Sequence, residues 1–387
     1  MNNAGPKRVM LVFGTRPEAI KMAPVVQALA AVPQWFEPVV VVTGQHREML
    51  DQVLSIFRLA PQYDLDIMLP GQTLSDVMIR GLERLDPVLE RERPDMVLVH
   101  GDAHSCLVGA LAAYYHQIPI GHVEAGLRTG DKYHPFPEEA NRRLTDTLSD
   151  LCFAPTTWAR DNLLRENTPV ERILVTGNTV IDALLTVVRP GYAYHVTLPP
   201  VLFDPGRRLV LVELHRRENF GRAMEEAFAA LGEVARTHPD VEMVVSVHPN
   251  PNVKEPARRW LSGQARVHLY EPFLYDDWAN LMSRAYLLIT DSGGLQEEAP
   301  AVGTPVLVYR DVTERPEAVA AGTVRLVGTG GEKLWQAAHE FLQDKIMHDD
   351  MAHRANPYGD GRASARIVQG LAHYFGFTHA PPEEFLV

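Results

Sequence analysis

The sequence predicts an α/β fold made of two doubly wound, Rossmann-like domains, each with a parallel sheet covered by helices on both faces. Short apolar runs rich in β-branched residues recur along the chain, and stretches of helical period separate them. One segment rich in proline and glycine interrupts this series near the middle. With 387 residues the chain exceeds the size at which one core usually keeps growing, so two domains are expected.

The first series of expected strands lies in the N-terminal half of the chain. Helical periodicity fills the intervals between them, most clearly at residues 17–30 and 105–116. Because the strand candidates are apolar throughout and do not alternate with polar residues, we expect them to be buried on both faces of a parallel sheet. The candidates are residues 8–13, 38–43, 96–100, 119–123 and 151–154.

A second series follows residues 190–205, where proline and glycine cluster and where we place the linker. Its strand candidates are residues 209–213, 241–247, 267–269, 286–290, 305–309 and 324–326. We therefore predict domains at 1–190 and 191–365, and a C-terminal helix at 366–387 that packs back on the N-terminal domain. Since ligands of open parallel sheets bind beyond the carboxyl ends of the strands, we expect the domains to face a central cleft.

Composition and charge disfavour several classes of protein. The net charge of −12 argues against general nucleic-acid binding, which needs a basic face, although a local group of cations can still bind one small anion. The two cysteines, Cys106 and Cys152, are too few for a disulfide framework and do not have the spacing of a zinc site, so we expect them in the core. No apolar run reaches the ~18 residues of a membrane span. We therefore expect a cytoplasmic protein without membrane contact.

Glycine and basic residues follow the first expected strand. Gly14 permits a tight turn into a helix, and Pro17 suits the first helical position. Arg16 and Lys21 then lie near a helix N-terminus, which attracts anions. The segment is neither a dinucleotide-binding glycine motif nor a Walker loop, so those two functions lose support. An ordinary strand-to-helix turn with exposed basic residues remains the alternative.

Carboxylates gather at the same edge of the first domain. Asp102 follows the third expected strand, as part of a site or only as a cap of the next helix. Glu124 is flanked by apolar residues, where we expect a raised pKa, as a general acid or base requires, unless it forms a structural salt bridge with Arg128. Glu138 and Glu139 begin another helix, where acids suit the helix dipole. Three acidic segments at one edge of the sheet are more than helix capping alone would require, which favours a functional site there.

The second domain carries a pattern typical of anion binding. His215 and two arginines follow its first strand, as in a phosphate clamp, whereas His248 after the next strand is more often structural. Residues 292–294, Ser-Gly-Gly, lead from a strand into a helix, where backbone N–H groups can approach an anion closely. Glu298 lies about one helical turn further on, where it can accept ribose hydroxyls, and Arg315 follows the next strand.

Six blocks of this sequence resemble the signature blocks of the non-hydrolysing UDP-N-acetylglucosamine 2-epimerases, in the family's order. They are residues 13–21, 122–128, 137–142, 215–219, 291–298 and 313–317. The resemblance implies the glycosyltransferase-B architecture. It also implies that UDP is eliminated from the sugar to give 2-acetamidoglucal and then adds back, with the proton delivered to the other face of carbon 2, which yields UDP-N-acetylmannosamine. No redox cofactor and no metal are needed.

Roles for individual residues follow from the match to the family's blocks. Asp102, Glu124 and Glu138 would be the catalytic carboxylates, since two faces of one carbon need separately placed proton-handling groups, and His215 would assist departure of UDP. The implied substrate contacts are Arg16, Lys21, Arg142, Phe273, Trp278, Ser292, Gly293, Gly294, Glu298 and Arg315. A second, activating UDP-N-acetylglucosamine site of bacterial members would use Gln45, Glu48, Arg217 and His248. The resemblance also implies a homodimer whose product supplies a cell-envelope polysaccharide.

Residues 103–106 depart from the family, which usually has a threonine run after the aspartate. Here the segment is Ala-His-Ser-Cys, so hydroxyls beside Asp102 are lost. Three other functions stay open. One is a hydrolysing relative that releases N-acetylmannosamine and UDP, and another is a glycosyltransferase, for which the sequence gives no acceptor signal. The third is a nucleotide-sugar sensor, in which three acids would serve no purpose.

Overall fold

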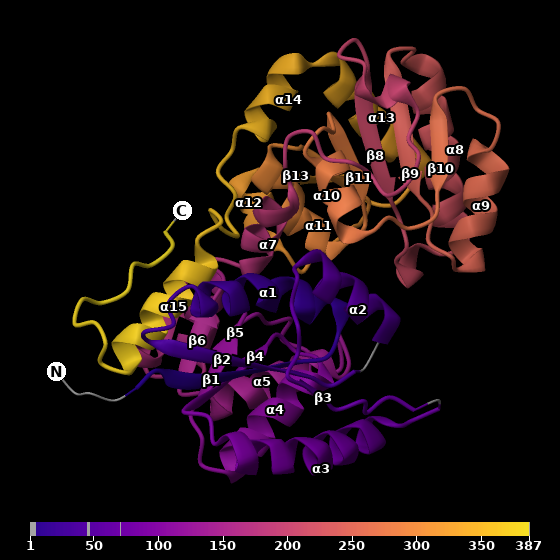
Figure 1. Ribbon diagram of the computed structural model, residues 1–387. Coiled ribbons are helices and arrows are strands. Elements are labelled where there is room, and N and C mark those ends of the chain that lie inside the picture. Colours follow the sequence, from indigo (N-terminus) through magenta and orange to yellow (C-terminus); the bar gives the residue numbers. More distant parts are fainter. Residues whose placement is uncertain (1–4, 45–46, 70, 387) are drawn as a thin grey trace. The chain divides into compact units, whose positions relative to one another are not determined.

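The computed structural model describes residues 5–44, 47–69 and 71–386. The chain forms two compact units. Unit 1 comprises Met1–Ala183 together with Tyr358–Leu386, and unit 2 comprises Leu184–Pro357. Each unit has its own parallel sheet (Figure 1). The predicted fold class, two doubly wound α/β domains, is confirmed.

Unit 1 is built on a seven-stranded sheet of order β3-β2-β1-β4-β5-β6-β7, parallel throughout. Its strands are β1 (Lys7–Phe13), β2 (Phe36–Val42), β3 (Tyr63–Asp64), β4 (Met96–His100), β5 (Ile120–Val123), β6 (Leu151–Ala154) and β7 (Ile173–Val175). The central strands are buried on both faces, which is why they read as continuous apolar runs. The strand order reverses between β1 and β4, so the ligand crevice of this sheet is expected there.

Helices cover both faces of this sheet. In Figure 1, α1 and α2 lie on one side of it, and α3 and α4 lie on the other. The helices of unit 1 are α1 (Arg16–Ala30), α2 (Arg47–Ile56), α3 (Leu74–Glu92), α4 (His104–Tyr115), α5 (Glu138–Leu148), α6 (Thr157–Arg165) and α15 (Ala363–Tyr374). Helix α7 (Thr179–Val187) carries the chain into unit 2. Helix α5 begins at Glu138, as predicted, with Pro137 as its N-cap.

The C-terminal segment of the chain completes unit 1. Helix α15 packs beside α1, and the carboxylate of Asp182 accepts the backbone N–H groups of Ala363 and Ser364 at 3.1 and 2.8 Å. Further on, Phe385 donates its N–H to the carbonyl oxygen of Val175 at 2.8 Å. Strand β7 would otherwise end the sheet with unpaired backbone groups, so this contact covers part of its edge.

Unit 2 has a six-stranded parallel sheet of order β10-β9-β8-β11-β12-β13. Its strands are β8 (Arg208–Glu213), β9 (Val241–Ser246), β10 (Val267–Tyr270), β11 (Leu287–Thr290), β12 (Val306–Val308) and β13 (Val324–Leu326). Its helices are α8 (Arg222–Thr237), α9 (Pro251–Leu261), α10 (Tyr275–Met282), α11 (Gly293–Glu298), α12 (Pro316–Ala321), α13 (Gly331–Gln343) and α14 (Lys345–Ala352). The order reverses between β8 and β11, so the segments after these two strands flank the expected crevice.

Eleven strands were predicted from the sequence, and the structure contains each of them with small shifts at the ends. Strands β3 and β7 were missed, because two and three residues are too few to show a periodicity. Among the described residues, no helix combines the length and the apolar character that crossing a membrane requires.

Candidate functional site

The predicted catalytic segments of unit 1 follow neighbouring strands. Gly14 comes after β1, Asp102 after β4 and Glu124 after β5, and these strands are adjacent in the sheet. Because all three strands are parallel, their carboxyl ends meet at one edge, beside the reversal of strand order. The fold therefore brings these segments together, as the sequence predicted.

Glu124 lies at the centre of this edge and is buried. Lys21 forms an ion pair with its Oε2, and the side-chain amide of Asn178 donates to the same oxygen at 3.0 Å. His100 Nε2 lies 3.7 Å from it. The backbone of Glu124 has φ +66°, a left-handed conformation that costs a non-glycine residue about 1–3 kcal/mol. Such strain persists only where surrounding contacts impose it.

The raised pKa predicted for Glu124 is wrong. Burial alone would raise the pKa, but the positive charge of Lys21, with smaller effects of His100 and Arg142, holds the pKa of Glu124 well below its usual range. Glu124 is therefore an ionised carboxylate at neutral pH. His100, also buried, has its pKa lowered to about 3 by burial and is neutral there. The alternative salt bridge with Arg128 does not form, because Arg128 pairs with Asp146 and Glu166.

Arg142, on α5, joins two of the predicted catalytic carboxylates. Its Nη2 contacts Asp102 Oδ2 and lies 3.4 Å from Glu124 Oε1, and its Nη1 donates to the backbone oxygen of Glu124. Burial would lower the pKa of Arg142, but Asp102 and Glu124 raise it, so the guanidinium stays charged. Asp102 keeps about a third of its side chain exposed (35%). It is the member of this group that a ligand can reach from solvent.

The two glutamates at the start of α5 have different surroundings. Glu139 is buried and accepts the backbone N–H groups of Thr129 and Gly130 at 2.9 and 3.3 Å, so it holds the preceding loop. Glu138 Oε2 is also buried but has no hydrogen-bond partner in the part of the chain that the structure describes. Glu138 lies four residues before Arg142 and hence on the same side of the helix. Of the two, Glu138 is the one whose carboxylate is available for chemistry.

The turn after β1 depends on Glu18, which the sequence analysis did not single out. Its Oε2 accepts the N–H groups of Gly14 and Thr15 at 3.0 and 2.7 Å, and Ser105 Oγ donates to it at 2.7 Å. Burial raises the pKa of Glu18. The pattern Thr15-x-x-Glu18, a capping box, was the signal that could have revealed it. Ser105 also shows that the departure at 103–106 keeps one hydroxyl in this region.

Gly14 is required by a close approach rather than by a left-handed backbone. A Cβ at this position would lie 1.8 Å from the Thr43 hydroxyl oxygen and 3.1 Å from Ser105 Cβ. Arg16, half-buried, begins α1 directly after this turn. Lys21, predicted as a nucleotide contact, has its amine on Glu124 instead of in open solvent.

In unit 2, Asp291 organises the segment that carries His215. The fully buried Asp291 carboxylate accepts the N–H groups of His215 and Arg216 at 3.0 and 2.9 Å and the Asn219 amide at 2.9 Å. The His215 ring stacks on that of His248, with centroids 5.8 Å apart and planes 24° from parallel. Burial lowers the pKa of His215 against the opposing effect of Asp291. The two histidines therefore form one group at the carboxyl ends of β8 and β9.

Ser292 caps α11, the helix predicted to receive the diphosphate. A Cβ on Gly293 would lie 2.8 Å from Glu314 Oε1, whereas one on Gly294 would meet no atom of the described residues within 4 Å. At the other end of α11, Glu298 is buried and accepts the Tyr275 hydroxyl at 2.9 Å. The open backbone at Gly294 agrees with the close approach of an anion at this helix start.

The predicted arginine and aromatic contacts of unit 2 are each held by neighbours. Arg315 Nε forms an ion pair with the buried Glu297. Phe273 and Trp278 stack with centroids 5.5 Å apart and are both mostly buried. Arg216 pairs with Glu314 at 3.2 Å. A phosphate bound here would therefore meet arginines whose positions are already fixed by carboxylates, which reduces the entropy lost on binding.

The four residues proposed for a second binding site are only partly described. Gln45 lies outside the described residues, and the side chain of Glu48, in α2, does as well. Arg217 is exposed in a short 3₁₀ segment, Arg217–Asn219. His248 is exposed at the end of β9, and its Nδ1 accepts the N–H of Asn250 at 3.2 Å.

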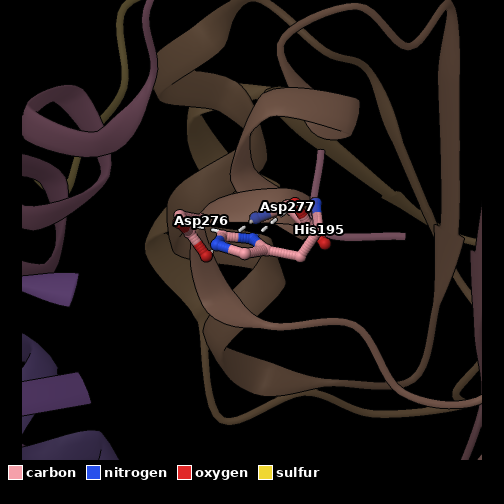
Figure 2. A group of neighbouring side chains, drawn as sticks. All are labelled: His195, Asp276 and Asp277. Carbon is pink, nitrogen blue, oxygen red and sulfur yellow. Dashed lines mark hydrogen bonds and ion pairs between the residues drawn. The ribbon is translucent and has the colours of Figure 1, made fainter. Parts of the chain in front are cut away.

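One group of side chains in the described part of the chain has the composition of a metal site: His195, Asp276 and Asp277 (Figure 2). His195 Nδ1 lies 3.2 Å from Asp277 Oδ1, which also accepts the His195 N–H at 3.0 Å and the Tyr192 hydroxyl at 2.9 Å. Burial, followed by hydrogen bonds to both aspartates, raises the pKa of Tyr192. These contacts give the group a structural role, because they fasten the segment after α7 to the start of α10.

A family model, a curated relative and two solved structures agree over most of the chain. The family model described as UDP-N-acetylglucosamine 2-epimerase matches residues 27–372. The UDP-N-acetylglucosamine 2-epimerase of Bacillus subtilis is 50% identical over 379 residues, covering 98% of each chain. The structure of S. aureus MnaA with UDP has a TM-score of 0.89 at 45% identity and covers 98% of this chain and 100% of that one. The Neisseria meningitidis UDP-GlcNAc 2-epimerase bound to UDP-GlcNAc has a TM-score of 0.84 at 44% identity, covering 94% and 99%.

Proposed function

This chain belongs to the UDP-N-acetylglucosamine 2-epimerase family, and we propose that it interconverts UDP-N-acetylglucosamine and UDP-N-acetylmannosamine without hydrolysis. The observation that carries this proposal is the contact of a single guanidinium nitrogen, Arg142 Nη2, with the carboxylates of both Asp102 and Glu124. Two acids fixed relative to each other suit a reaction that handles a proton on either face of one carbon.

In the proposed reaction a base removes the proton at carbon 2, and the electrons of that bond form a double bond between carbons 1 and 2. UDP leaves with the electron pair of its bond to carbon 1, which gives 2-acetamidoglucal. UDP then adds back while a proton returns to the opposite face. Glu124 is held ionised by Lys21 and Arg142, so it would start as a proton acceptor. Glu138, whose buried oxygen has no hydrogen-bond partner among the described residues, and Asp102, with its partly exposed side chain, are the proposed groups for the other proton transfers. No redox cofactor and no metal enter this scheme.

Unit 2 is proposed to bind the UDP portion. The start of α11, at Ser292, Gly293 and Gly294, would receive the diphosphate, because backbone N–H groups there are unused by the helix. Glu298 would accept ribose hydroxyls, and Arg315 would add a charged contact to phosphate. The proposed uracil contacts are Phe273 and Trp278. His215, after β8, and Arg16 and Lys21, on α1, are proposed contacts of the nucleotide, and Arg142 is a proposed contact of the sugar.

Several wider features belong to the same proposal. They are a cytoplasmic homodimer, supply of a precursor for cell-envelope polysaccharide, and activation by UDP-N-acetylglucosamine at a second site. The relatives from N. meningitidis and S. aureus, which bind UDP-GlcNAc and UDP, support the choice of ligand. A sigmoidal dependence of rate on substrate concentration would support the second site, and a hyperbolic one would count against it.

Proton NMR of UDP-N-acetylglucosamine incubated with the enzyme in D₂O tests the proposal directly. We expect the manno epimer to form with deuterium at carbon 2 and no added cofactor. Release of free N-acetylmannosamine and UDP would instead identify the hydrolysing reaction. An unchanged spectrum despite UDP binding would contradict both reactions and favour a transferase or a sensor.

A further inference from the structure

His122, in the middle of the catalytic edge, makes two hydrogen bonds that both require it to donate. Its ring is fully buried on β5. Nδ1 lies 2.6 Å from Asp146 Oδ1, and Nε2 lies 2.7 Å from the backbone carbonyl oxygen of Gly101. A carbonyl oxygen can only accept, so Nε2 must carry a hydrogen. If Asp146 is ionised, Nδ1 must carry one as well, and the ring is then a cation.

The surroundings of Asp146 show that it is ionised. Its second oxygen, Oδ2, accepts the N–H of Gly126 at 3.2 Å and Nη2 of Arg128 at 2.7 Å. Burial would raise the pKa of Asp146, but His122 and then Arg128 lower it by more. Protonation of Asp146 would remove the buried negative charge that both His122 and Arg128 contact, which is costly inside the protein.

We infer that His122 is held as an imidazolium and that, through the buried ion pair with Asp146, it positions the backbone segments that carry Asp102 and Glu124. His122 orients the Gly101 carbonyl directly before Asp102. Asp146 holds the N–H of Gly126, two residues after Glu124. The assignment of His122 as a positioning residue rests on the proposed function, whereas its charge does not.

The geometry explains why a neutral ring would not serve. In the tautomer with hydrogen on Nδ1, the lone pair of Nε2 would face the Gly101 oxygen at 2.7 Å, and the two would repel. Gly101 has φ +67°, and its N–H donates to the carbonyl oxygen of Val123 at 2.9 Å. Besides His122, the donor that contacts the Gly101 carbonyl is the weak thiol of Cys106, at 3.3 Å. The charged ring therefore supplies the strong contact that fixes the start of the Asp102 segment.

No other group packed against the ring competes for this charge. Cys106, from α4, places Sγ 3.7 Å from Nε2, and burial raises the pKa of its thiol, which stays neutral. His100, from β4, is neutral because burial lowers its pKa to about 3. Arg128 faces Asp146 rather than the ring. Within the described residues, Asp146 is the only ionised group that contacts His122.

The charge can be tested without any enzyme assay, by NMR of the full-length protein with ¹⁵N-labelled histidine. We expect both ring nitrogens of His122 to resonate as protonated nitrogens in the folded protein at pH 7, because each faces an acceptor oxygen. The signals are assigned by their absence from His122→Gln. A ring nitrogen without hydrogen near pH 7 would overturn the inference, whatever reaction the enzyme catalyses.

The positioning role is tested with Asp146→Asn, which removes the charge that the ring requires but keeps a similar shape. We expect kcat for epimerisation to fall by about 100-fold, the scale for a small misplacement of catalytic groups, with KM and UDP affinity within about twofold. Cys106→Ala, the control, removes the weaker donor to the same carbonyl, together with the thiol's contact to Thr145 Oγ1, and should keep near-normal kcat. Unchanged kcat in a folded Asp146→Asn enzyme would refute the positioning role. Wild-type protein that does not epimerise would refute the proposed function alone.

Discussion

Arg142 contacts Glu124 at two points: Nη1 donates to its backbone oxygen, and Nη2 lies 3.4 Å from its side-chain oxygen Oε1. The backbone contact helps to hold Glu124 in the left-handed conformation that it would otherwise leave. The side-chain contact adds to the charge of Lys21 that keeps the carboxylate ionised. Arg142 thus sets both the place and the charge of Glu124.

Replacement of Lys21 by methionine should make stability depend on pH in a defined way. Since the pKa of Glu124 is depressed in the folded state, its ionisation stabilises the protein above the unfolded pKa of about 4.3. That stability is lost as pH falls through the folded pKa. Lys21→Met raises the folded pKa, so the loss of stability should be largest near pH 7 and shrink toward about pH 4. Chemical denaturation across this range measures it.

The matched control for this prediction is Lys254→Met, which removes an exposed pair with Glu271. Exposed pairs contribute at most about 1 kcal/mol, so little change is expected at any pH. A loss in Lys21→Met that is equal at both ends of the pH range would contradict the assigned cause of the Glu124 shift.

Glu138 and Glu139 should respond in opposite ways to replacement by glutamine. Glu138→Gln changes an oxygen that has no partner in the described part of the chain, so we expect a fall in turnover of about 100-fold or more with nearly unchanged stability. Glu139→Gln weakens two charged hydrogen bonds to the loop at Thr129 and Gly130 and should cost about 1–3 kcal/mol of stability. Steady-state kinetics and denaturation on both variants separate the roles. If Glu138→Gln instead lowered stability and Glu139→Gln lowered turnover, the catalytic role would belong to Glu139 and the structural role to Glu138.

Alanine at Gly14 should destabilise unit 1 by about 1–3 kcal/mol, the usual cost of overpacking. The added Cβ would overlap the Thr43 hydroxyl, and Ser105 leaves little room on its other side. Gly294→Ala is the control, because no atom of residues 5–44, 47–69 or 71–386 lies within 4 Å of a Cβ there. Adding Thr43→Ala to the Gly14 variant should recover part of the loss. No recovery would mean that the hydroxyl is not the obstacle.

Arg315→Met should weaken UDP binding by about 10- to 100-fold, the equivalent of one charged hydrogen bond to phosphate. Titration calorimetry with UDP measures the change. Arg325→Met removes an exposed pair with Glu340 on the same unit and serves as the control. Equal affinities of the Arg315 variant and the wild type would remove Arg315 from the proposed phosphate site.

The sheets could be predicted from the sequence because strands that are buried on both faces, such as β1 and β8, consist of long apolar runs. The charge state of Glu124 could not be predicted in this way. Its apolar neighbours in sequence suggested a raised pKa, whereas the cations that lower it come from Lys21 on α1 and Arg142 on α5. The residues next to Glu124 in sequence belong to one strand and its turn, whereas the pKa of a buried carboxylate depends on the charges of every element packed around it.

Glu138 and Glu139 illustrate a second limit. Both acids suit the first turn of a helix, so a helix-dipole argument cannot separate them. Only the direction of each side chain does, and the preceding loop at 129–130 captures Glu139 alone. The predicted candidate Glu138 came from the family resemblance rather than from its own surroundings.

The return of Tyr358–Leu386 to unit 1 has a consequence for how the protein is made. A ribosome that has finished residues 1–183 has released most of the first sheet, but α15 and the strand-edge contact at Phe385 are still untranslated. Until they arrive, the face of α1 that α15 covers and the edge of β7 stay open to solvent and to other nascent chains. The domain that starts first is thus the one that finishes last, after all of unit 2 has emerged.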